Sequence, residues 1–212
     1  MAAIALAAIL LGPVGVVLMT AAVLAGIATE WHRLIRRGLS TAWAVGGGLY
    51  LLFAGFCFCY IYFGPDFDNT NELGRASLFW FLSVVIANDC FAYGVGRWLG
   101  GPRLAPRVSP KKTWSGTVGG IAAAGVFGAL VGWLLGAGSV AALGAIGFLL
   151  GLIAQVGDLA ESGIKRQVGV KDTGKLIPGH GGLLDRVDGI AAAAIALALA
   201  QASSGTVALQ WQ

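Results

Sequence analysis

The sequence predicts an all-α protein, a polytopic membrane bundle of about six helices, and two observations support this prediction. Of its 212 residues, 57% are hydrophobic and only 11% are charged, whereas a soluble domain carries about 25% charged residues. Six segments are also apolar over roughly the 20 residues with which a helix crosses the hydrocarbon core of a bilayer. A single membrane-embedded domain over residues 1–212 accounts for both observations.

The six expected spans cover residues 3–28, 41–63, 76–98, 116–136, 139–160 and 187–207. The first span contains Pro13, which a helix inside a bundle tolerates as a kink. No Lys or Arg precedes this apolar run, and it is longer than the core of a typical signal peptide, so we expect a retained spanning helix. The last span is rich in alanine and becomes polar toward its C-terminal end.

The basic residues predict how the bundle is oriented. Of the 14 Lys and Arg residues, all except Arg75 lie in or beside the loops that follow the first, third and fifth spans. The intervening connections are the net acidic stretch GPDFDNTNELGR and the short GAGS. Because the cytoplasmic loops of membrane proteins are enriched in Lys and Arg, both termini are expected outside the cell, N-out and C-out.

The fourth span carries a small residue at every fourth position: Gly116, Gly120, Ala124, Gly128, Gly132 and Gly136. This repeat predicts a groove along one helix face, where a neighbouring backbone can approach closely. The neighbour can be another helix of the same chain or a second copy of the protein, and the sequence leaves both open.

Asn88 and Asp89 lie well inside the third span. A carboxylate at the centre of a membrane helix costs on the order of 3 kcal/mol or more, so Asp89 is expected to face the bundle interior or a wet cavity. Two interpretations remain open, a hydrogen bond between helices and a substrate-binding pair.

A second polar feature is the run Ser109-Pro110-Lys111-Lys112-Thr113, which precedes the fourth span. Ser109 and Pro110 predict a turn. A Ser or Thr near a helix start can cap the helix, and free N–H groups there attract anions. With two lysines beside it, the run suits a phosphate group, although contact with anionic lipids or a role in topology explains the lysines equally well.

Three aspartates lie at the ends of two neighbouring spans. Asp158 ends the fifth span, with Glu161 and Ser162 within one further turn, and Asp185 and Asp188 are three residues apart at the start of the sixth. On a helix, that spacing places both side chains on one face. Carboxylates that converge from two helix ends provide the hard oxygen ligands that Mg²⁺ prefers, with waters and substrate phosphates completing its coordination.

The loop between these aspartates combines cations with glycine. Lys165, Arg166, Lys171 and Arg186 can bind phosphate oxygens, and the glycines around His180 let the backbone approach a ligand. His180 is expected to bind phosphate or to position the loop, since no Cys lies near it in the sequence to support a zinc site. A solvated loop of ordinary salt bridges is the alternative. The mixture of carboxylates, cations and glycine favours metal-assisted chemistry on a phosphate.

The whole pattern resembles the CDP-diacylglycerol synthases, also called phosphatidate cytidylyltransferases. The run Ser162-Gly-Ile-Lys-Arg, followed by Lys171-Asp172, Pro178-Gly-His-Gly-Gly and Asp185-Arg-Val-Asp188, is similar to the signature of this family at every fixed position. The Asn88-Asp89 pair and the stretch 109–113 resemble the family as well. By this resemblance, residues 76–212 are the catalytic part, with the signature at 162–188, and residues 1–75 are variable N-terminal helices.

The resemblance implies an enzyme that joins CTP and phosphatidate to give CDP-diacylglycerol and pyrophosphate. It implies Mg²⁺, with K⁺ as a candidate companion, held by Asp158, Asp185 and Asp188. The implied catalytic residues are Asp158, Lys165, Arg166, Lys171, Asp172, His180, Asp185, Arg186 and Asp188. The implied substrate-binding residues are Asn88, Asp89, Ser109, Lys111, Lys112, Thr113, Ser162, Gly181 and Gly182.

The resemblance also implies an integral membrane homodimer, surrounded by membrane lipids, and no nucleic-acid partner is expected. The basic residues predict that the active site faces the cytoplasm, at the inner (plasma) membrane. The chain departs from the family pattern in two respects. It is short, since members commonly have additional N-terminal helices, and Ser115 stands where many relatives have an acidic residue.

Other functions remain as alternatives. A polyprenol or dolichol kinase, or an enzyme like CDP-archaeol synthase, would use CTP with a different lipid, and the kinases would release CDP rather than pyrophosphate. A small membrane transporter is expected to have binding residues near the bilayer midplane, whereas most charges here lie toward one face. A purely structural scaffold would leave the charged cluster unexplained.

Overall fold

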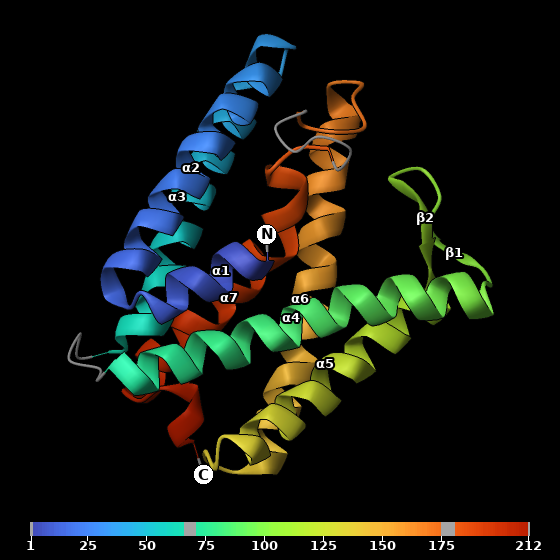
Figure 1. Ribbon diagram of the computed structural model, residues 1–212. Helices are drawn as coiled ribbons and strands as arrows, with labels where there is room; N and C mark the ends of the chain where they lie inside the picture. Colours follow the sequence, from blue (N-terminus) through green and yellow to red (C-terminus); the bar gives the residue numbers. More distant parts are fainter. Residues whose placement is uncertain (1, 66–70, 175–180, 212) are drawn as a thin grey trace.

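The computed structural model describes residues 2–65, 71–174 and 181–211, and most of them are helical (Figure 1). The elements are α1 (Ala2–Leu10), α2 (Pro13–Arg36), α3 (Thr41–Phe63), α4 (Asn71–Leu99), β1 (Arg103–Ala105), β2 (Ser109–Thr113), α5 (Trp114–Leu134), α6 (Val140–Gln167), α7 (Leu184–Ser204) and the 3-10 turn η1 (Ala208–Gln210). Six of these helices, α2 to α7, are long and apolar enough to cross a membrane. The predicted all-α bundle of an integral membrane protein is confirmed.

The first expected span, residues 3–28, is wrong in one respect, because it is two helices rather than one kinked helix. α1 ends at Leu10 and α2 begins at Pro13. Between them, Gly12 has a φ of 79°, which L side chains rarely adopt. Pro13 suits the first position of α2, where its missing N–H would have no helical acceptor. The chain turns sharply here, so that α1 packs against both α2 and α4.

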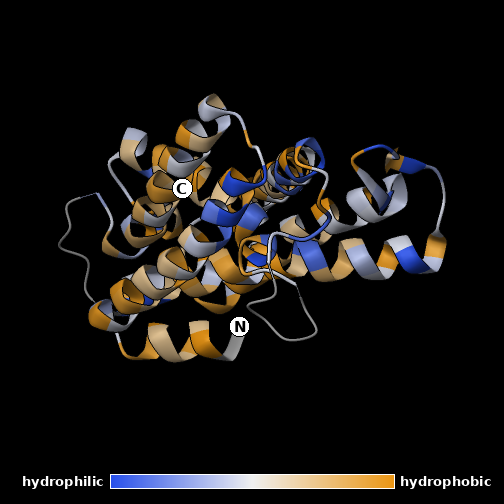
Figure 2. Cartoon of the chain, turned by 90° about the horizontal axis from the view of Figure 1, so that it is seen from above, coloured by the Kyte–Doolittle hydropathy of each residue, from blue (hydrophilic) through white to orange (hydrophobic). Residues whose placement is uncertain are grey.

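The longer helices pack as neighbours in the order α2, α3, α7, α6, α5 and α4. α4 crosses α6 at a large angle, and α5 packs along both of them (Figure 1). The largest fully buried side chains are Trp80, Tyr62 and Phe81, and they belong to one apolar core. Hydrophilic residues gather near the middle of the view from above and along the hairpin (Figure 2). The polar residues therefore lie together where several helix ends meet.

The small-residue stripe serves packing within the chain along α5, except at Gly136, which lies beyond the end of the helix and where an added Cβ atom would meet nothing within 4 Å. A Cβ atom added at Gly120 would lie 2.6 Å from the carbonyl oxygen of Asn88 in α4, and one at Gly128 would lie 2.7 Å from that of Leu143 in α6. The indole N–H of Trp80 also donates to the Gly128 carbonyl at 2.9 Å. The glycines thus allow α4 and α6 to approach the backbone of α5 closely.

The segment before α5 is a β-hairpin, in which β1 and β2 are antiparallel and Ala105 pairs with Ser109. The predicted turn at Ser109 and Pro110 is wrong, because both residues lie in β2 and the turn comes just before them. Pro110 is tolerated because an edge strand does not need every backbone N–H. Thr113 ends the strand and caps α5, as its hydroxyl accepts a hydrogen bond from the Gly116 N–H.

The two helices of the charged segment are longer than expected. α6 continues to Gln167 instead of ending near residue 160, and α7 begins at Leu184 rather than 187. Lys165 therefore lies on α6, and both Asp185 and Asp188 lie on α7. Rigid helices rather than loops hold these charged side chains.

Candidate active site

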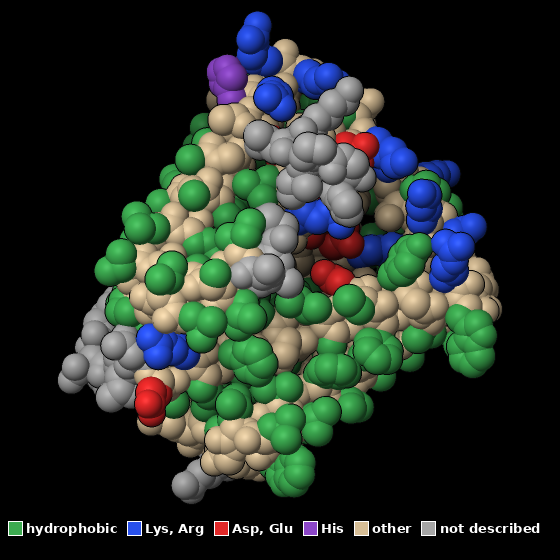
Figure 3. Space-filling model, viewed as in Figure 1, with side chains coloured by type: hydrophobic (Ala, Val, Ile, Leu, Met, Phe, Trp, Pro, Cys, Tyr) green, Lys and Arg blue, Asp and Glu red, His purple; other side chains and the backbone are tan. Residues whose placement is uncertain are grey.

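The charged helix ends surround an open polar cavity of about 690 Å³, formed by α4, the hairpin and the adjacent parts of α5, α6 and α7. Figure 3 shows acidic side chains inside the hollow and Lys and Arg side chains around it. The charged lining residues are Asp89, Arg97, Arg103, Lys111, Lys112, Asp158, Lys165, Asp185, Arg186 and Asp188. Distant parts of the sequence thus form one site that suits a polyanionic ligand.

Lys112 connects the hairpin to α6. Its ammonium forms an ion pair with Asp158 at 2.5 Å and donates a hydrogen bond to Gln155 Oε1 at 3.0 Å. Lys111, on the same strand, is exposed and also lines the cavity. One lysine is therefore held by α6, while the other is an exposed charge at the cavity.

Asn88 and Asp89 are adjacent but have different surroundings. Asn88 is fully buried, and its amide donates to Asp89 Oδ1 at 3.1 Å and accepts from Gln155 Nε2 at 3.4 Å. Asp89 lines the cavity. The structure thus gives Asn88 a position between helices, from which it orients the carboxylate of its neighbour.

Lys165 lies between two carboxylates. Its ammonium is 2.7 Å from Glu161 Oε2 on the same helix and 2.7 Å from Asp185 Oδ1 on α7. Lys165 is buried, and a buried charge needs such partners because desolvation costs several kcal/mol per ion. The lysine therefore joins α6 to α7.

Asp185 accepts hydrogen bonds from three donors. Besides the Lys165 ammonium, the backbone N–H groups of Thr173 and Gly182 donate to its Oδ2, at 3.1 and 2.8 Å. Asp185 also lies in the first turn of α7, where the helix dipole favours negative charge. The carboxylate is thereby fixed in position and orientation.

The carboxylates of Asp158, Glu161 and Asp188 lie near one another on α6 and α7. The negative charges of Asp158 and Glu161 both act on Asp188. Oε1 of Glu161 is buried and accepts no hydrogen bond from an N–H or hydroxyl group in the described part of the chain, and the carboxyl group of Asp188 lies within hydrogen-bond reach of Glu161. Such a group suits a hard cation, because neighbouring negative charges repel one another. Among the described residues, no three acidic, His or Cys side chains are already arranged around a metal position.

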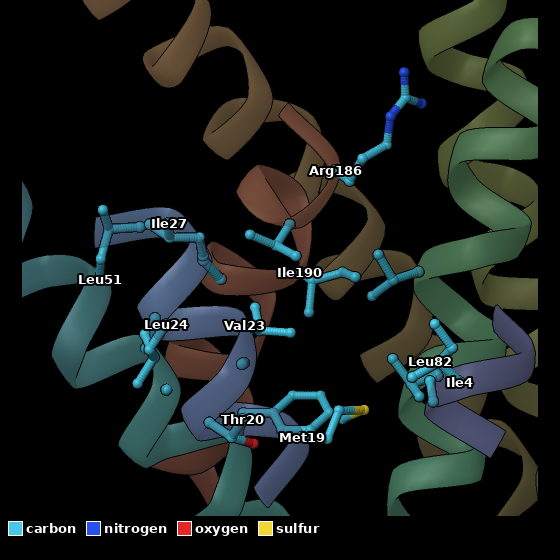
Figure 4. A pocket seen from close by; sticks show the side chains of 18 of the residues that line it. Ile4, Met19, Thr20, Val23, Leu24, Ile27, Leu51, Leu82, Arg186 and Ile190 are labelled. Carbon is cyan, nitrogen blue, oxygen red and sulfur yellow. The ribbon is translucent and has the colours of Figure 1, made fainter. Parts of the chain in front are cut away.

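A second cavity, of about 280 Å³, lies within the bundle and is lined mainly by apolar side chains of α1, α2, α3, α4 and α7. In Figure 4, the side chains of Val23, Leu82 and Ile190 line this cavity, and Arg186 lies at its edge with its guanidinium pointing away from them. Asp89 and Arg186 line both cavities. The apolar cavity and the polar cavity therefore adjoin at these two charged residues.

A model of the Cytidylyltransferase family matches residues 41–203, a stretch that includes every lining residue of the polar cavity. The chain belongs to this family. Membership confirms the family resemblance of the sequence.

Three relatives named phosphatidate cytidylyltransferase show the extent of the similarity. The Brucella abortus protein is 47% identical over 129 residues, which are 61% of this chain and 48% of the relative. The Mycobacterium leprae protein is 38% identical over 122 residues, 58% of this chain and 39% of the relative. The Helicobacter pylori protein is 35% identical over 131 residues, 62% of this chain and 49% of the relative. The chain spans about half the length, or less, of these curated relatives.

Two of the predicted residues support the site from α6. The guanidinium of Arg166 donates to the carbonyl oxygens of Val108 in the hairpin and Val170 in the following loop, each at 3.0 Å. The hydroxyl of Ser162 donates to Asp158 at 3.4 Å. In the structure, Arg166 therefore positions the hairpin, and Ser162 orients a carboxylate of the cavity.

Other predicted residues that the structure describes, on β2 and in the segment between α6 and α7, are not among the lining residues of the polar cavity. Ser109 is half-buried in β2, and Lys171 and Asp172 are exposed after α6. Gly181 has a φ of 83°, a conformation that favours glycine. His180 lies outside the described residues.

Sequence reasoning missed Glu30, near the end of α2. Its carboxylate is fully buried and accepts hydrogen bonds from the backbone at the start of α7. A single glutamate at the end of an apolar span is ordinary in a sequence, and its partners lie 143 to 154 positions away. Glu30 also lies outside the stretch that the family model matches.

Proposed function

We propose that the chain transfers a cytidylyl group from CTP to phosphatidate, giving CDP-diacylglycerol and pyrophosphate. The observation that carries the proposal is the junction of the two cavities at Asp89 and Arg186. A lipid phosphate needs such a junction, because its acyl chains stay in an apolar environment while its headgroup meets a water-soluble nucleotide. Family membership supports the transferred group, and the names of the relatives support the lipid.

Both substrates carry phosphates, which suit the cations of the polar cavity. Arg186 fits the phosphate of the lipid, because a guanidinium offers a planar fork of donors to phosphate oxygens. Lys111 and Lys112 fit the triphosphate of CTP from the hairpin. One acyl chain would occupy the apolar cavity shown in Figure 4.

The transfer starts when an oxygen of the lipid phosphate attacks the α-phosphorus of CTP. A new P–O bond forms while the bond between the α-phosphorus and its bridging oxygen breaks, and pyrophosphate leaves with the electron pair. The attacking phosphate is already ionised at neutral pH, so the step needs no general base. The residues of the cavity orient two polyanions and reduce their mutual repulsion.

The carboxylates of the site fit Mg²⁺ by their chemistry. They are hard oxygen donors, and several of them converge where the negative charges of Asp158 and Glu161 act on Asp188, so a cation would reduce their mutual repulsion. Asp158, Asp185 and Asp188 would hold the ion, with K⁺ as a candidate second ion. When bound, a divalent cation would neutralise phosphate oxygens and stabilise the leaving pyrophosphate.

The proposal includes an orientation and an assembly. Lys and Arg side chains gather mainly on one side of the view in Figure 3, which supports a site facing the cytoplasm of the inner (plasma) membrane, with both termini outside. The family resemblance supports a homodimer and a catalytic part over residues 76–212.

Pyrophosphate release from CTP by the purified protein in detergent micelles tests the proposal. Release is expected only when phosphatidate and Mg²⁺ are both present, with CDP-diacylglycerol formed in equal amount. Release of CDP with phosphorylation of another lipid would identify a kinase instead. Solute flux across vesicles without nucleotide turnover would identify a transporter.

A further inference from the structure

Glu30 is fully buried, with 0% of its surface exposed, near the C-terminal end of α2. A carboxylate in such a place is costly unless donors satisfy both of its oxygens. Its donors are Thr173, in the segment after α6, and Leu183 and Leu184, at the start of α7. The contacts of this side chain therefore connect the end of α2 to the start of α7.

The Glu30 carboxylate caps α7 from another helix. Oε1 accepts from the Leu183 N–H at 3.0 Å, and Oε2 accepts from the Leu184 N–H at 2.9 Å. The first N–H groups of a helix have no acceptor within it, and the N-cap residue of α7, Leu183, provides no side-chain cap. The Thr173 hydroxyl donates to Oε2 as well, at 3.1 Å.

Two glycines make room for Glu30. A Cβ atom at Gly174 would lie 2.3 Å from Glu30 Oε1, and one at Gly182 would lie 2.8 Å from Oε2 and 2.1 Å from the Thr173 hydroxyl. No side chain fits at those distances. At these two positions, glycine is needed so that the backbone can close on the carboxylate of α2.

The residues that contact Glu30 also hold Asp185. The N–H of Thr173 and the N–H of Gly182 donate to Asp185, and Leu184 immediately precedes it. Asp185 in turn accepts from Lys165 of α6. Glu30 is thus linked to the Asp185 carboxylate of the polar cavity through the residues that lie between them, such as Thr173.

We propose that Glu30 is a positioning residue, which fixes the start of α7 and thereby the Asp185 carboxylate for the transfer reaction. Its catalytic consequence rests on the proposed function, whereas the anchoring of α7 does not. α2 becomes part of the active site by this role, although Glu30 lies outside residues 41–203 that match the family.

The Glu30→Gln variant tests the role, because an amide cannot replace the carboxylate in either orientation. Each oxygen of Glu30 faces a backbone N–H, so the NH₂ group of Gln would always meet a donor. Glu72→Gln is the matched control, since Glu72 is an exposed glutamate in the first turn of α4. Both variants are compared with the wild-type protein in detergent micelles.

Two measurements separate positioning from folding. Hydrogen exchange at the amides of Leu183 and Leu184 is expected to become about tenfold faster in Glu30→Gln. The kcat of pyrophosphate release is expected to fall about 10- to 100-fold, with a smaller change in KM for CTP because the lysines of the hairpin are untouched. Glu72→Gln should match the wild-type protein in both measurements.

Exchange at wild-type rates in Glu30→Gln would overturn the proposal, and so would faster exchange with an unchanged kcat. If the wild-type protein released no pyrophosphate but the exchange difference appeared, the proposed function would fail while the anchoring of α7 by Glu30 stood. If Glu30→Gln did not fold, Thr173→Val would take its place as the test. This substitution removes the hydroxyl that donates to Glu30 and keeps the backbone N–H that donates to Asp185. Exchange at Leu184 about 2- to 10-fold faster in that variant supports the proposal, and an unchanged rate overturns it.

Discussion

Glu30 and Glu161 are buried glutamates near the C-terminal ends of α2 and α6, yet their partners differ in kind. Neutral donors satisfy both oxygens of Glu30, namely two backbone N–H groups and a hydroxyl. Glu161 instead has the charged Lys165 at one oxygen, the carboxyl group of Asp188 within hydrogen-bond reach, and the negative charge of Asp185 nearby. The protein itself thus satisfies both oxygens of Glu30. Glu161, by contrast, belongs to a cluster of charged groups that depend on one another.

The difference separates two tasks at the same end of the bundle. Backbone donors around Glu30 need no ligand, so the α2 side can hold α7 in place whether or not substrate is bound. The carboxylates of α6 and α7 repel one another, and their balance depends on Lys165 and on any cation that binds. Ligand binding is therefore expected to change the contacts among the carboxylates of α6 and α7, and to leave the contacts of Glu30 with the start of α7 unchanged.

The largest effect is expected from Lys165→Met, which removes the cation of the α6–α7 side. Glu161 and Asp185 would then be buried without their partner, and breaking a buried ion pair in this way costs about 3–5 kcal/mol. The free energy of unfolding in detergent micelles measures the loss, with Lys111→Met as the control because Lys111 is exposed. A loss under about 1 kcal/mol would mean that the pair is solvated, as surface salt bridges are.

Asp185→Asn is expected to keep the fold but to lower pyrophosphate release about 10²- to 10³-fold. The amide keeps an oxygen for the N–H groups of Thr173 and Gly182, but it loses the charge that pairs with Lys165 and would bind a cation. The loss equals about 3–4 kcal/mol of transition-state stabilisation. Turnover and the midpoint of unfolding are measured on the same preparation. Full activity in a folded Asp185→Asn protein would remove Asp185 from the proposed metal ligands.

The bundle and most of the site were predictable because they follow from local composition. Apolar segments of spanning length identified the six helices, and the spacing of Asp185 and Asp188 placed both on one helix start. The lysine pair before α5 was expected to bind phosphate, and this stays a prediction; both lysines line the polar cavity, and Lys112 is paired with Asp158. Charged side chains at the ends of membrane helices are kept out of the hydrocarbon core, so the sequence alone constrained their positions.

Features that depend on contacts between distant segments were not predictable. Pro13 was expected to kink one helix, but the chain turns sharply there because α1 packs against α4. Pro110 was expected in a turn, whereas pairing with β1 makes it part of a strand. Glu30 carried no local sign of its role, since its donors are near residues 173 and 183. In each case tertiary packing overrides a local preference.

The smallest effect on stability is expected where α5 packs against α6, a contact without charged side chains. Gly128 of α5 is in close contact with α6, and a Cβ atom there would lie 2.7 Å from the Leu143 carbonyl oxygen. Gly128→Ala is expected to lower the free energy of unfolding by about 1–3 kcal/mol through overpacking. The folded fraction should keep wild-type turnover, because Gly128 lies outside the lining of the polar cavity.

Gly46→Ala in α3 is the matched control for Gly128→Ala, because a Cβ atom at Gly46 meets nothing within 4 Å. Alanine is the better helix former by about 1 kcal/mol, so the control should be as stable as the wild-type protein or slightly more so. Equal destabilisation of both variants would mean that glycine serves these helices through flexibility rather than close packing. Lost turnover in folded Gly128→Ala would mean that the α5–α6 contact also sets the position of Asp158 on α6, and the packing region would then be coupled to the charged one.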